Sequence, residues 1–249
     1  MMKLDQFTLI FSITVYLLGC AFTSQPATVP THSSAIASPT DAPVATLEVN
    51  TEQQNMDLIS AANEGNAAAV GDLLAQRASV HASDERGVTA LIAASYQNHL
   101  EVARLLIEAG ADVNVKDDSQ QSAYLIPTAD GYLEFLKLTL RSRADVHSLD
   151  SYNGTGLIRA ADRGHIEIIK ELLETNIDID HVNRLGWTAL LEAIILGDGG
   201  PRHTEVAGLL VQAGADVNLA DNDKDTPLDH ARQRGFKEIV AILESSGAR

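Results

Sequence analysis

A repeat of 33 residues is the feature of this 249-residue sequence that most restricts how it can fold. A similar short motif, opened by a hydroxyl residue, occurs five times at spacings of 33, 33, 33 and 38 residues. The opening residues are Thr89, Ser122, Thr155, Thr188 and Thr226. A second motif of the type Ala-Asp-Val-Asn recurs in step with it, at 111–114, 144–147, 177–180 and 215–218. A degenerate first unit fits from Met56 to His81. Such a period is typical of proteins whose units pack only against their neighbours.

The apolar residues within each repeat are spaced for two short helices. In the fourth unit, residues 157–161 pattern the first helix and Gly164-His165 makes the turn. Residues 166–173 then carry an apolar stripe at i, i+3, i+6 and i+7, which predicts a second amphipathic helix. The repeat therefore predicts an all-α fold of paired helices.

The combination of Thr-Pro/Ala-Leu, Gly-His and Ala-Asp-Val-Asn in a 33-residue period resembles the ankyrin repeat. The resemblance implies a solenoid of about six helix–loop–helix units with β-hairpin-like connecting loops, over residues 55–249. The units are expected at about 55–83, 84–116, 117–149, 150–182, 183–220 and 221–249. The family's Thr-Pro-Leu-His tetrapeptide is absent, which removes a side-chain hydrogen bond from each unit.

The charge balance argues against polyanionic partners. Eighteen Lys and Arg against 34 Asp and Glu give a formal net charge of −16. Because binding to nucleic acid or to anionic lipid depends on clustered cations, neither is expected to occur through this surface. The acidity serves either solubility or the electrostatic steering of a basic partner.

The N-terminus has the pattern of an export signal. Residues 7–18 form an apolar run that is too short to span a bilayer but fits a signal-peptide core. The tetrapeptide at 17–20, Leu-Leu-Gly-Cys, resembles the lipobox of bacterial lipoproteins, in which the cysteine is lipidated. Cys20 is the only cysteine, so an internal disulfide is excluded. The alternatives are a plain cleaved signal or an uncleaved anchor.

These features predict three segments: a signal peptide at 1–19, a disordered Ser/Thr/Pro/Ala-rich tether at 20–54, and the repeat domain at 55–249. Ala21 follows the cysteine where an aspartate would favour the inner membrane. By analogy with enterobacterial lipoproteins, we expect the periplasmic side of the outer membrane. The soluble alternative is a periplasmic or secreted protein.

Three departures from the repeat invite a functional interpretation. Pro127 stands inside the first helix of unit three and should bend that helix or tighten its first turn. Trp187, the only tryptophan, precedes Thr188 in a turn that the resemblance places on the concave face. It is either an interface anchor or packed against its own hairpin.

Unit five is longer by five residues, in the Gly/Pro-rich stretch 196–203. Asp198, Arg202 and His203 lie there, and glycine-rich backbone before a helix can bind an anion. The stretch matches neither a Walker A motif nor a dinucleotide fingerprint, so a surface or partner-contacting loop is the simpler interpretation.

The family's variable contact positions, transferred by register, predict a protein-binding surface of mixed charge with aromatic and arginine anchors. It comprises Arg86, Val88, Tyr96, Gln97, Asp118, Gln121, Asp130, Tyr152, Arg163, Arg184, Leu185 and Trp187.

No catalytic motif stands out, and the histidines have no metal-ligand spacing, so we expect no enzyme, no cofactor and no metal. The hypothesis is a monomeric, non-enzymatic lipoprotein that captures another protein on its concave face. Two alternatives stay open. One is an inhibitor or immunity-type protein that neutralises a cationic toxin or hydrolase. The other is a small-ligand or anion site at residues 197–203.

Overall fold

The repeat domain is a stack of helix pairs. The computed structural model describes residues 44–249, with side chains from residue 51 onward. Within that range the regular structure is helical, and two isolated bridges, Ser83–Thr89 and Lys116–Ser122, close hairpin loops instead of forming strands. The predicted signal peptide, Cys20 and the beginning of the predicted tether lie outside the described residues. None of the helices in residues 44–249 is both long and apolar enough to cross a membrane.

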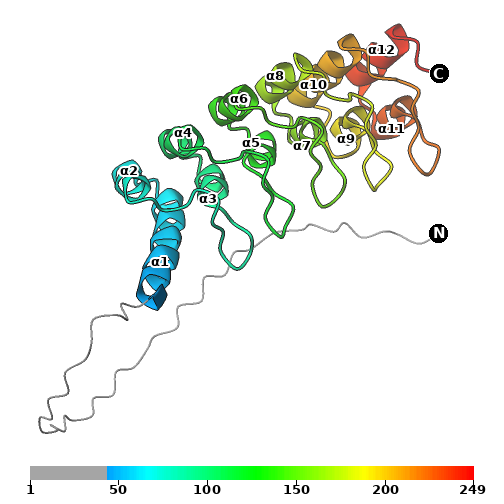
Figure 1. Ribbon diagram of the computed structural model, residues 1–249. Helices are drawn as coiled ribbons and strands as arrows, with labels where there is room; N and C mark the ends of the chain where they lie inside the picture. The colour runs from blue at the N-terminus through cyan, green and yellow to red at the C-terminus, as the bar shows by residue number, and fades with distance from the viewer. Residues whose placement is uncertain (1–43) are drawn as a thin grey trace, which may run out of the picture. The chain divides into compact units, whose positions relative to one another are not determined.

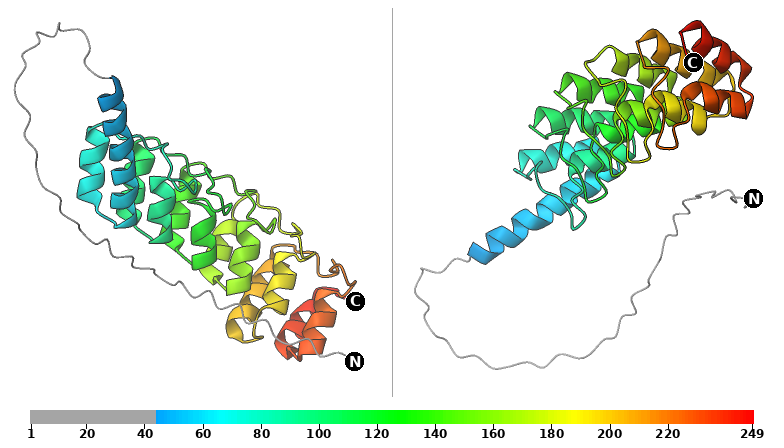
Figure 2. Two further views of the ribbon diagram at one scale, coloured as in Figure 1. Left: turned by 90° about the horizontal axis from the view of Figure 1, so that it is seen from below. Right: turned by 90° about the vertical axis from the view of Figure 1, so that its right-hand side faces the viewer.

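The helices form two rows that follow each other along the domain (Figure 1). The first helices of the six pairs are α1 (Val44–Asn63), α3 (Ala90–Tyr96), α5 (Leu125–Asp130), α7 (Gly156–Arg163), α9 (Ala189–Ile195) and α11 (Pro227–Arg234). The second helices are α2 (Ala67–Ala75), α4 (Leu100–Glu108), α6 (Leu133–Arg141), α8 (Ile166–Leu173), α10 (Pro201–Gln212) and α12 (Lys237–Ser245). Long loops project from the row of first helices, as Figures 1 and 2 show. The predicted all-α solenoid of six helix–loop–helix units is confirmed.

Helix α1 places the start of the folded domain earlier than predicted. The tether is predicted to reach residue 54, but α1 already begins at Val44. Pro43 is the last proline of the Ser/Thr/Pro/Ala-rich stretch, and no proline or glycine follows it before Gly65. Because nothing interrupts the backbone hydrogen bonds after Pro43, the helix runs for 20 residues.

The repeated hydroxyl residue is a helix N-cap. The Thr89 hydroxyl accepts a hydrogen bond from the backbone N–H of Ile92 at 3.3 Å, and Thr155 accepts one from Ile158 at 3.4 Å. Thr188 and Thr226 cap α9 and α11 in the same way. Replacing such a cap by alanine typically costs about 1 kcal/mol. The 33-residue period is therefore the period of helix starts.

Pro127 shortens the first helix of unit three. Ser122 occupies the cap position, and its hydroxyl accepts a hydrogen bond from the N–H of Leu125 at 3.1 Å. Helix α5 nevertheless begins only at Leu125, because Pro127 has no N–H to donate back to the first turn. Pro127 therefore delays the start of the helix, which is a different change from the predicted bend or tightened first turn. Tyr124 beside it is fully buried, and its hydroxyl donates to the carbonyl oxygen of Val146 at 3.4 Å. Tyr124 therefore belongs to the core and not to the surface.

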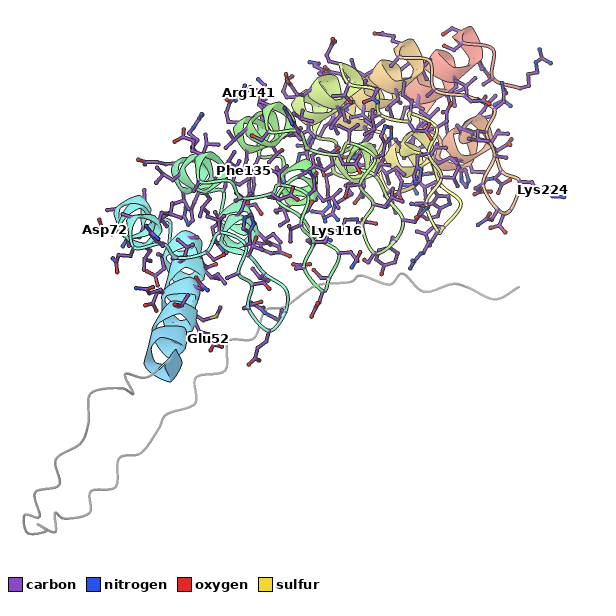
Figure 3. The ribbon with its side chains drawn as sticks, viewed as in Figure 1. Glu52, Asp72, Lys116, Phe135, Arg141 and Lys224 are labelled. Atoms are coloured by element: carbon purple, nitrogen blue, oxygen red, sulfur yellow. The ribbon has the colours of Figure 1, made fainter. Side chains whose placement is uncertain are left out.

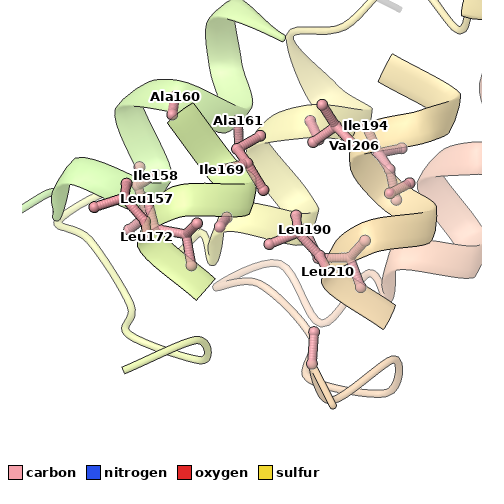
Figure 4. Packing of buried hydrophobic residues seen from close by; sticks show 14 of the residues in the cluster. Leu157, Ile158, Ala160, Ala161, Ile169, Leu172, Leu190, Ile194, Val206 and Leu210 are labelled. Atoms are coloured by element: carbon pink, nitrogen blue, oxygen red, sulfur yellow. The ribbon is translucent and has the colours of Figure 1, made fainter. Parts of the chain in front are cut away.

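Two apolar clusters make up most of the core. One joins buried residues of α1 to α6, and the other runs from α5 to α12. Figure 4 shows part of the second, where Leu157, Ile169 and Leu172 meet Leu190 and neighbouring side chains. Every unit buries its apolar face against the next, so the stack as a whole supplies the stability that a single unit lacks.

Candidate protein-binding surface

Each hairpin loop is closed by one Asx residue five positions before the cap. The carboxylate or amide oxygen of this clasp residue accepts two backbone N–H bonds, from the residues two and four positions later. Asp150, for example, accepts from Tyr152 and Gly154, both at 2.8 Å. The clasp residues are Asp84, Asp117, Asp150, Asn183 and Asp221. Because the loop is hydrogen-bonded internally, its tip is held in one conformation.

Neighbouring hairpins are also bonded to each other. The backbone N–H of Asp118 donates to the carbonyl oxygen of Arg86 at 2.9 Å. The N–H of Arg184 donates to the carbonyl oxygen of Tyr152, again at 2.9 Å. The side chain of Asn222 donates to the carbonyl oxygen of Leu185 at 3.1 Å. These links join the tips of units two and three and the tips of units four to six, which gives the preorganised backbone that a binding module requires.

Most of the predicted contact residues are exposed, some in the hairpin loops and others at the C-terminal ends of the first helices. Tyr152 is 64% exposed and Leu185 is 46% exposed, although both are large and apolar. The exposed predicted residues are Arg86, Tyr96, Gln97, Asp118, Asp130, Tyr152, Arg163, Arg184 and Leu185, whereas Gln121 and Trp187 are only half-buried. Trp187 therefore offers part of its ring to the surface and packs the rest.

Val88 is wrongly predicted as a contact residue. Its side chain is buried and packs with Ile92, Ala93 and Ile126. Its N–H donates to the Asp84 carboxylate at 2.9 Å, which holds the residue at the base of the hairpin instead of the tip. The repeat register alone could not distinguish Val88 from Trp187, because both stand one residue before the cap. The small side chain of Val88 turns inward, whereas the larger one of Trp187 stays half exposed.

The prediction missed a column of residues four positions after the caps, here named the inner column. It consists of Ala93, Ile126, Arg159, Glu192 and His230. In units two and three these side chains are apolar and buried. In units four to six they are polar, and each bonds the clasp residue nine positions before it. The constant spacing of nine between Asp150 and Arg159 and between Asp221 and His230 is the signal that could have revealed them.

The polar pairs of the inner column have short contacts. Arg159 Nη1 lies 3.2 Å from Asp150 Oδ2, and His230 Nε2 lies 2.8 Å from Asp221 Oδ2. Burial alone would raise the pKa of Asp221, but hydrogen bonds from His230 and from two backbone N–H groups lower it. Asp221 is therefore ionised at neutral pH, and both pairs anchor the hairpins to the helices behind them.

Unit five carries a different pair. The amide nitrogen of Asn183 donates to Glu192 Oε1 at 2.6 Å, where the neighbouring units pair an aspartate with a base. Burial raises the pKa of Glu192 to about 7, and the nearby charges of Asp162 and Asp150 add to this effect. An asparagine at 183 avoids placing a second carboxylate beside Glu192.

Two buried polar atoms among the described side chains lack a partner: Gln121 Oε1 and Arg159 Nε. One is an acceptor and the other a donor, and both belong to the hairpin-and-helix surface of units three and four. Buried polar atoms without a partner are uncommon and call for a water or ligand contact.

The predicted ligand loop has a packing role. Helix α10 begins at Pro201, so part of the insertion extends this helix to 12 residues. His203 is buried, with Nδ1 3.0 Å from Asp198 Oδ1 and Nε2 3.1 Å from the carbonyl oxygen of Asp162. His165 contacts the carbonyl oxygen of Ala129 in the same way, at 2.9 Å. His203 thus takes the place of the turn histidines His99 and His165 of units two and four, and both of its nitrogens are occupied.

The rest of the insertion is held just as closely. Arg234 donates to the carbonyl oxygen of Gly197 at 2.8 Å. A Cβ at Gly164 would lie 2.5 Å from Cδ of Arg202, so the stem of this exposed arginine packs on the preceding turn. Gly/Pro richness here reflects close packing between units.

The geometry defines a repeat solenoid with a row of preorganised loops, and comparison identifies its family. The family model described as "Ankyrin repeats (3 copies)" matches residues 43–117 and 124–221, well over half of the chain. The chain belongs to the ankyrin repeat family.

Several known proteins are similar to it. An ankyrin-repeat domain from Acinetobacter baumannii, solved as a crystal structure, is 48% identical, with a TM-score of 0.75, and the match covers 77% of this chain and 98% of that one. The human ASB11 ankyrin-repeat domain is 27% identical, with a TM-score of 0.66, over 77% of this chain and 84% of that one. The ankyrin repeat protein YahD of Escherichia coli K12 is 47% identical over 58 residues, which are 23% of this chain and only 29% of that protein.

Ankyrin repeats are modules for protein–protein interaction, and the family is generally non-enzymatic. In the part of the chain that the structure describes, no group of three or more His, Cys, Asp or Glu side chains could hold a metal ion. The family and the surface together support a binding function.

Proposed function

We propose that this chain captures a partner protein on the row of hairpin tips and the adjoining ends of the first helices. The residues that carry the contact are Arg86, Tyr96, Gln97, Tyr152, Arg163, Arg184 and Leu185. Aromatic and arginine side chains of this kind dominate the binding energy of protein interfaces.

The observation that carries the proposal is the exposure of Tyr152 and Leu185 on a fixed backbone. Tyr152 is 64% exposed, and its carbonyl oxygen accepts a hydrogen bond from the N–H of Arg184. A large apolar side chain costs little to desolvate, and a backbone that is already ordered loses little entropy on binding. Both properties favour the binding of a partner at Tyr152 and Leu185 over leaving these side chains exposed to water.

A pull-down from envelope extracts of the source bacterium tests the proposal. The full chain is compared with Tyr152→Ala/Arg184→Ala/Leu185→Ala, and with Arg141→Ala as a matched control. Arg141 is exposed on the row of second helices, away from the hairpins (Figure 3). We expect one protein to be retained by the wild type and by Arg141→Ala and lost from the triple variant. Equal retention by all three would place the interface elsewhere, and retention by none would contradict capture.

We further propose that Cys20 tethers the domain to the bacterial envelope, on the periplasmic side of the outer membrane. The lipobox-like sequence at 17–20 supports this, as does the alanine after Cys20. At roughly 3.5 Å per residue, residues 21–43 span at most about 80 Å. Cys20→Ser should move the protein from the membrane fraction to the soluble fraction and abolish incorporation of labelled palmitate. Unchanged fractionation would rule out the lipid anchor.

A cationic target is the second candidate, and the net charge of −16 favours it. The chain would then act as an inhibitor or immunity-type protein whose field speeds association. Once the partner is in hand, its association rate should fall steeply as salt is raised from 50 to 500 mM. A rate independent of salt would exclude steering.

A further inference from the structure

The row of second helices contains a groove between α10 and α12. Its volume is about 720 Å³, and Glu205, Gly208 and Leu209 line it from α10. Glu238 and Ile242 line it from α12. Figure 1 shows that α8, α10 and α12 follow one another in this row, on the far side of the first helices from the hairpin tips. The groove is thus separate from the proposed capture surface.

The preceding steps of the same row hold a lysine at this place. Lys170 Nζ lies 2.9 Å from Glu167 Oε1 on its own helix and 3.5 Å from Glu205 Oε1 on the next helix. Lys137 Nζ similarly lies 3.5 Å from Glu134 of its own helix and 3.9 Å from Glu171 of the next. An ammonium group between two glutamates therefore recurs along the outer row.

At the next step of the row, where the groove lies, both glutamates of this arrangement have counterparts but its lysine does not. Aligned by the turn residues His165, His203 and Phe236, Glu167 and Lys170 of α8 correspond to Glu205 and Gly208 of α10. The next-helix glutamate, Glu205 for Lys170, corresponds to Glu238 of α12. None of the ion pairs in residues 51–249 includes Glu238. The groove between α10 and α12 thus corresponds to the place between α8 and α10 where the Lys170 side chain lies.

The groove has room for such a side chain, and its chemistry suits one. A Cβ added at Gly208 would contact only Cδ1 of Ile242, at 3.8 Å. Leu209 and Ile242 provide apolar surface for a four-carbon stem, and the two carboxylates can receive the ammonium. Two carboxylates are too few for calcium, which takes six to eight oxygen ligands.

We propose that this groove binds the side chain of a lysine presented by a partner protein. The ammonium pairs with Glu205 and Glu238, as Lys170 pairs with Glu167 and Glu205. The stem lies on Leu209 and Ile242. The inference goes beyond the proposed capture by the hairpin tips, because it gives the domain a second docking point on its opposite face.

Binding is tested by NMR on the full chain labelled with ¹⁵N, using Nα-acetyl-lysine methylamide as the probe and the norleucine analogue as the control. The probe should give saturable shifts of the Gly208 and Leu209 amides, and the analogue, which lacks the ammonium, should not. Glu238→Gln should weaken binding by about threefold to fivefold. No saturable shift, or equal shifts with norleucine, would overturn the proposal.

Stability provides an independent test. Gly208→Lys supplies the missing ammonium from the chain itself, whereas Gly208→Ala gains helix propensity only. The lysine variant should melt about 1–3 °C above the alanine variant and lose the shifts with the probe. Gly71 of α2 is the matched control, because Ala68 stands three residues before it instead of a glutamate. Because only Glu101 of the next helix is available to it, its lysine variant should gain less over its alanine variant than at position 208.

An equal melting temperature for Gly208→Lys and Gly208→Ala would show that the carboxylates do not form an ammonium site. None of these variants touches a hairpin tip, so the pull-down with the triple variant is unaffected by them. Failure here and failure of the capture proposal are therefore distinguishable.

Discussion

The inner column differs between the two halves of the domain. In units two and three it is apolar: Ala93 and Ile126 are buried with Val88 and Ile92. In units four to six it is polar, and Arg159, Glu192 and His230 each bond a clasp residue. The hydroxyl caps and the clasp hydrogen bonds are the same in both halves. The cap and the clasp therefore set the fold, and the inner column is free to vary in chemistry.

The largest effect is expected in the apolar half. Ile126→Ala truncates a buried side chain that packs with Val88 and Ile92 and leaves a cavity in this cluster. We expect the free energy of unfolding to fall by about 2–4 kcal/mol, measured by urea denaturation. A loss below about 1 kcal/mol would mean that the apolar column does not contribute to the core.

In unit five, the Asn183–Glu192 pair can be replaced by the aspartate–arginine pair of unit four. Asn183→Asp places a carboxylate next to Glu192 and should cost about 1–3 kcal/mol at pH 8. Adding Glu192→Arg recreates the Asp150–Arg159 pair of unit four and should recover most of this loss. A double variant as unstable as the single one would show that the pairs depend on more than their charges.

The pH dependence of Glu192 gives a smaller effect. Its pKa is raised from 4.5 to about 7, so the folded state holds a proton that the unfolded state releases. The stabilising contribution is full below pH 4.5 and is lost as the pH rises towards 7. Glu192→Gln should therefore exceed the wild type by about 1–2 kcal/mol at pH 8 and match it near pH 4.5. A constant difference across this range would contradict a titrating Glu192.

The smallest effect on stability is expected at the hairpin tips. Tyr152→Ala and Leu185→Ala remove exposed side chains and should change the free energy of unfolding by no more than about 0.5 kcal/mol. Thermal unfolding of the two variants checks this. A larger loss would mean that these side chains serve the fold, which would weaken the case for binding.

Much of the fold follows from local chemistry that the sequence displays. Thr155 and Thr188 mark helix starts because a hydroxyl there caps free N–H groups, and alanines such as Ala160 mark close helix contacts. The exposed tips at Tyr152 and Leu185 follow from the same register. Helix α1 was not predictable from the repeat, since no motif marks residues 44–55.

The inner column and the insertion depend on packing between units, which register does not reveal. Glu192 is buried only because hairpin and helix close over it, and Val88 turns inward because it is small enough to fit. His203 looks like a loop residue in the sequence. Its bond to the carbonyl oxygen of Asp162 requires the preceding unit to be in place.

The most direct test of the central claim is photocrosslinking from the hairpin row. Tyr152 is replaced by p-benzoyl-phenylalanine in the full chain, and Arg141 is replaced in the same way as the control. After irradiation in the source organism, we predict one crosslinked protein from position 152 and none from position 141. Crosslinks from 141 alone, or from neither position, would contradict capture by the hairpin tips.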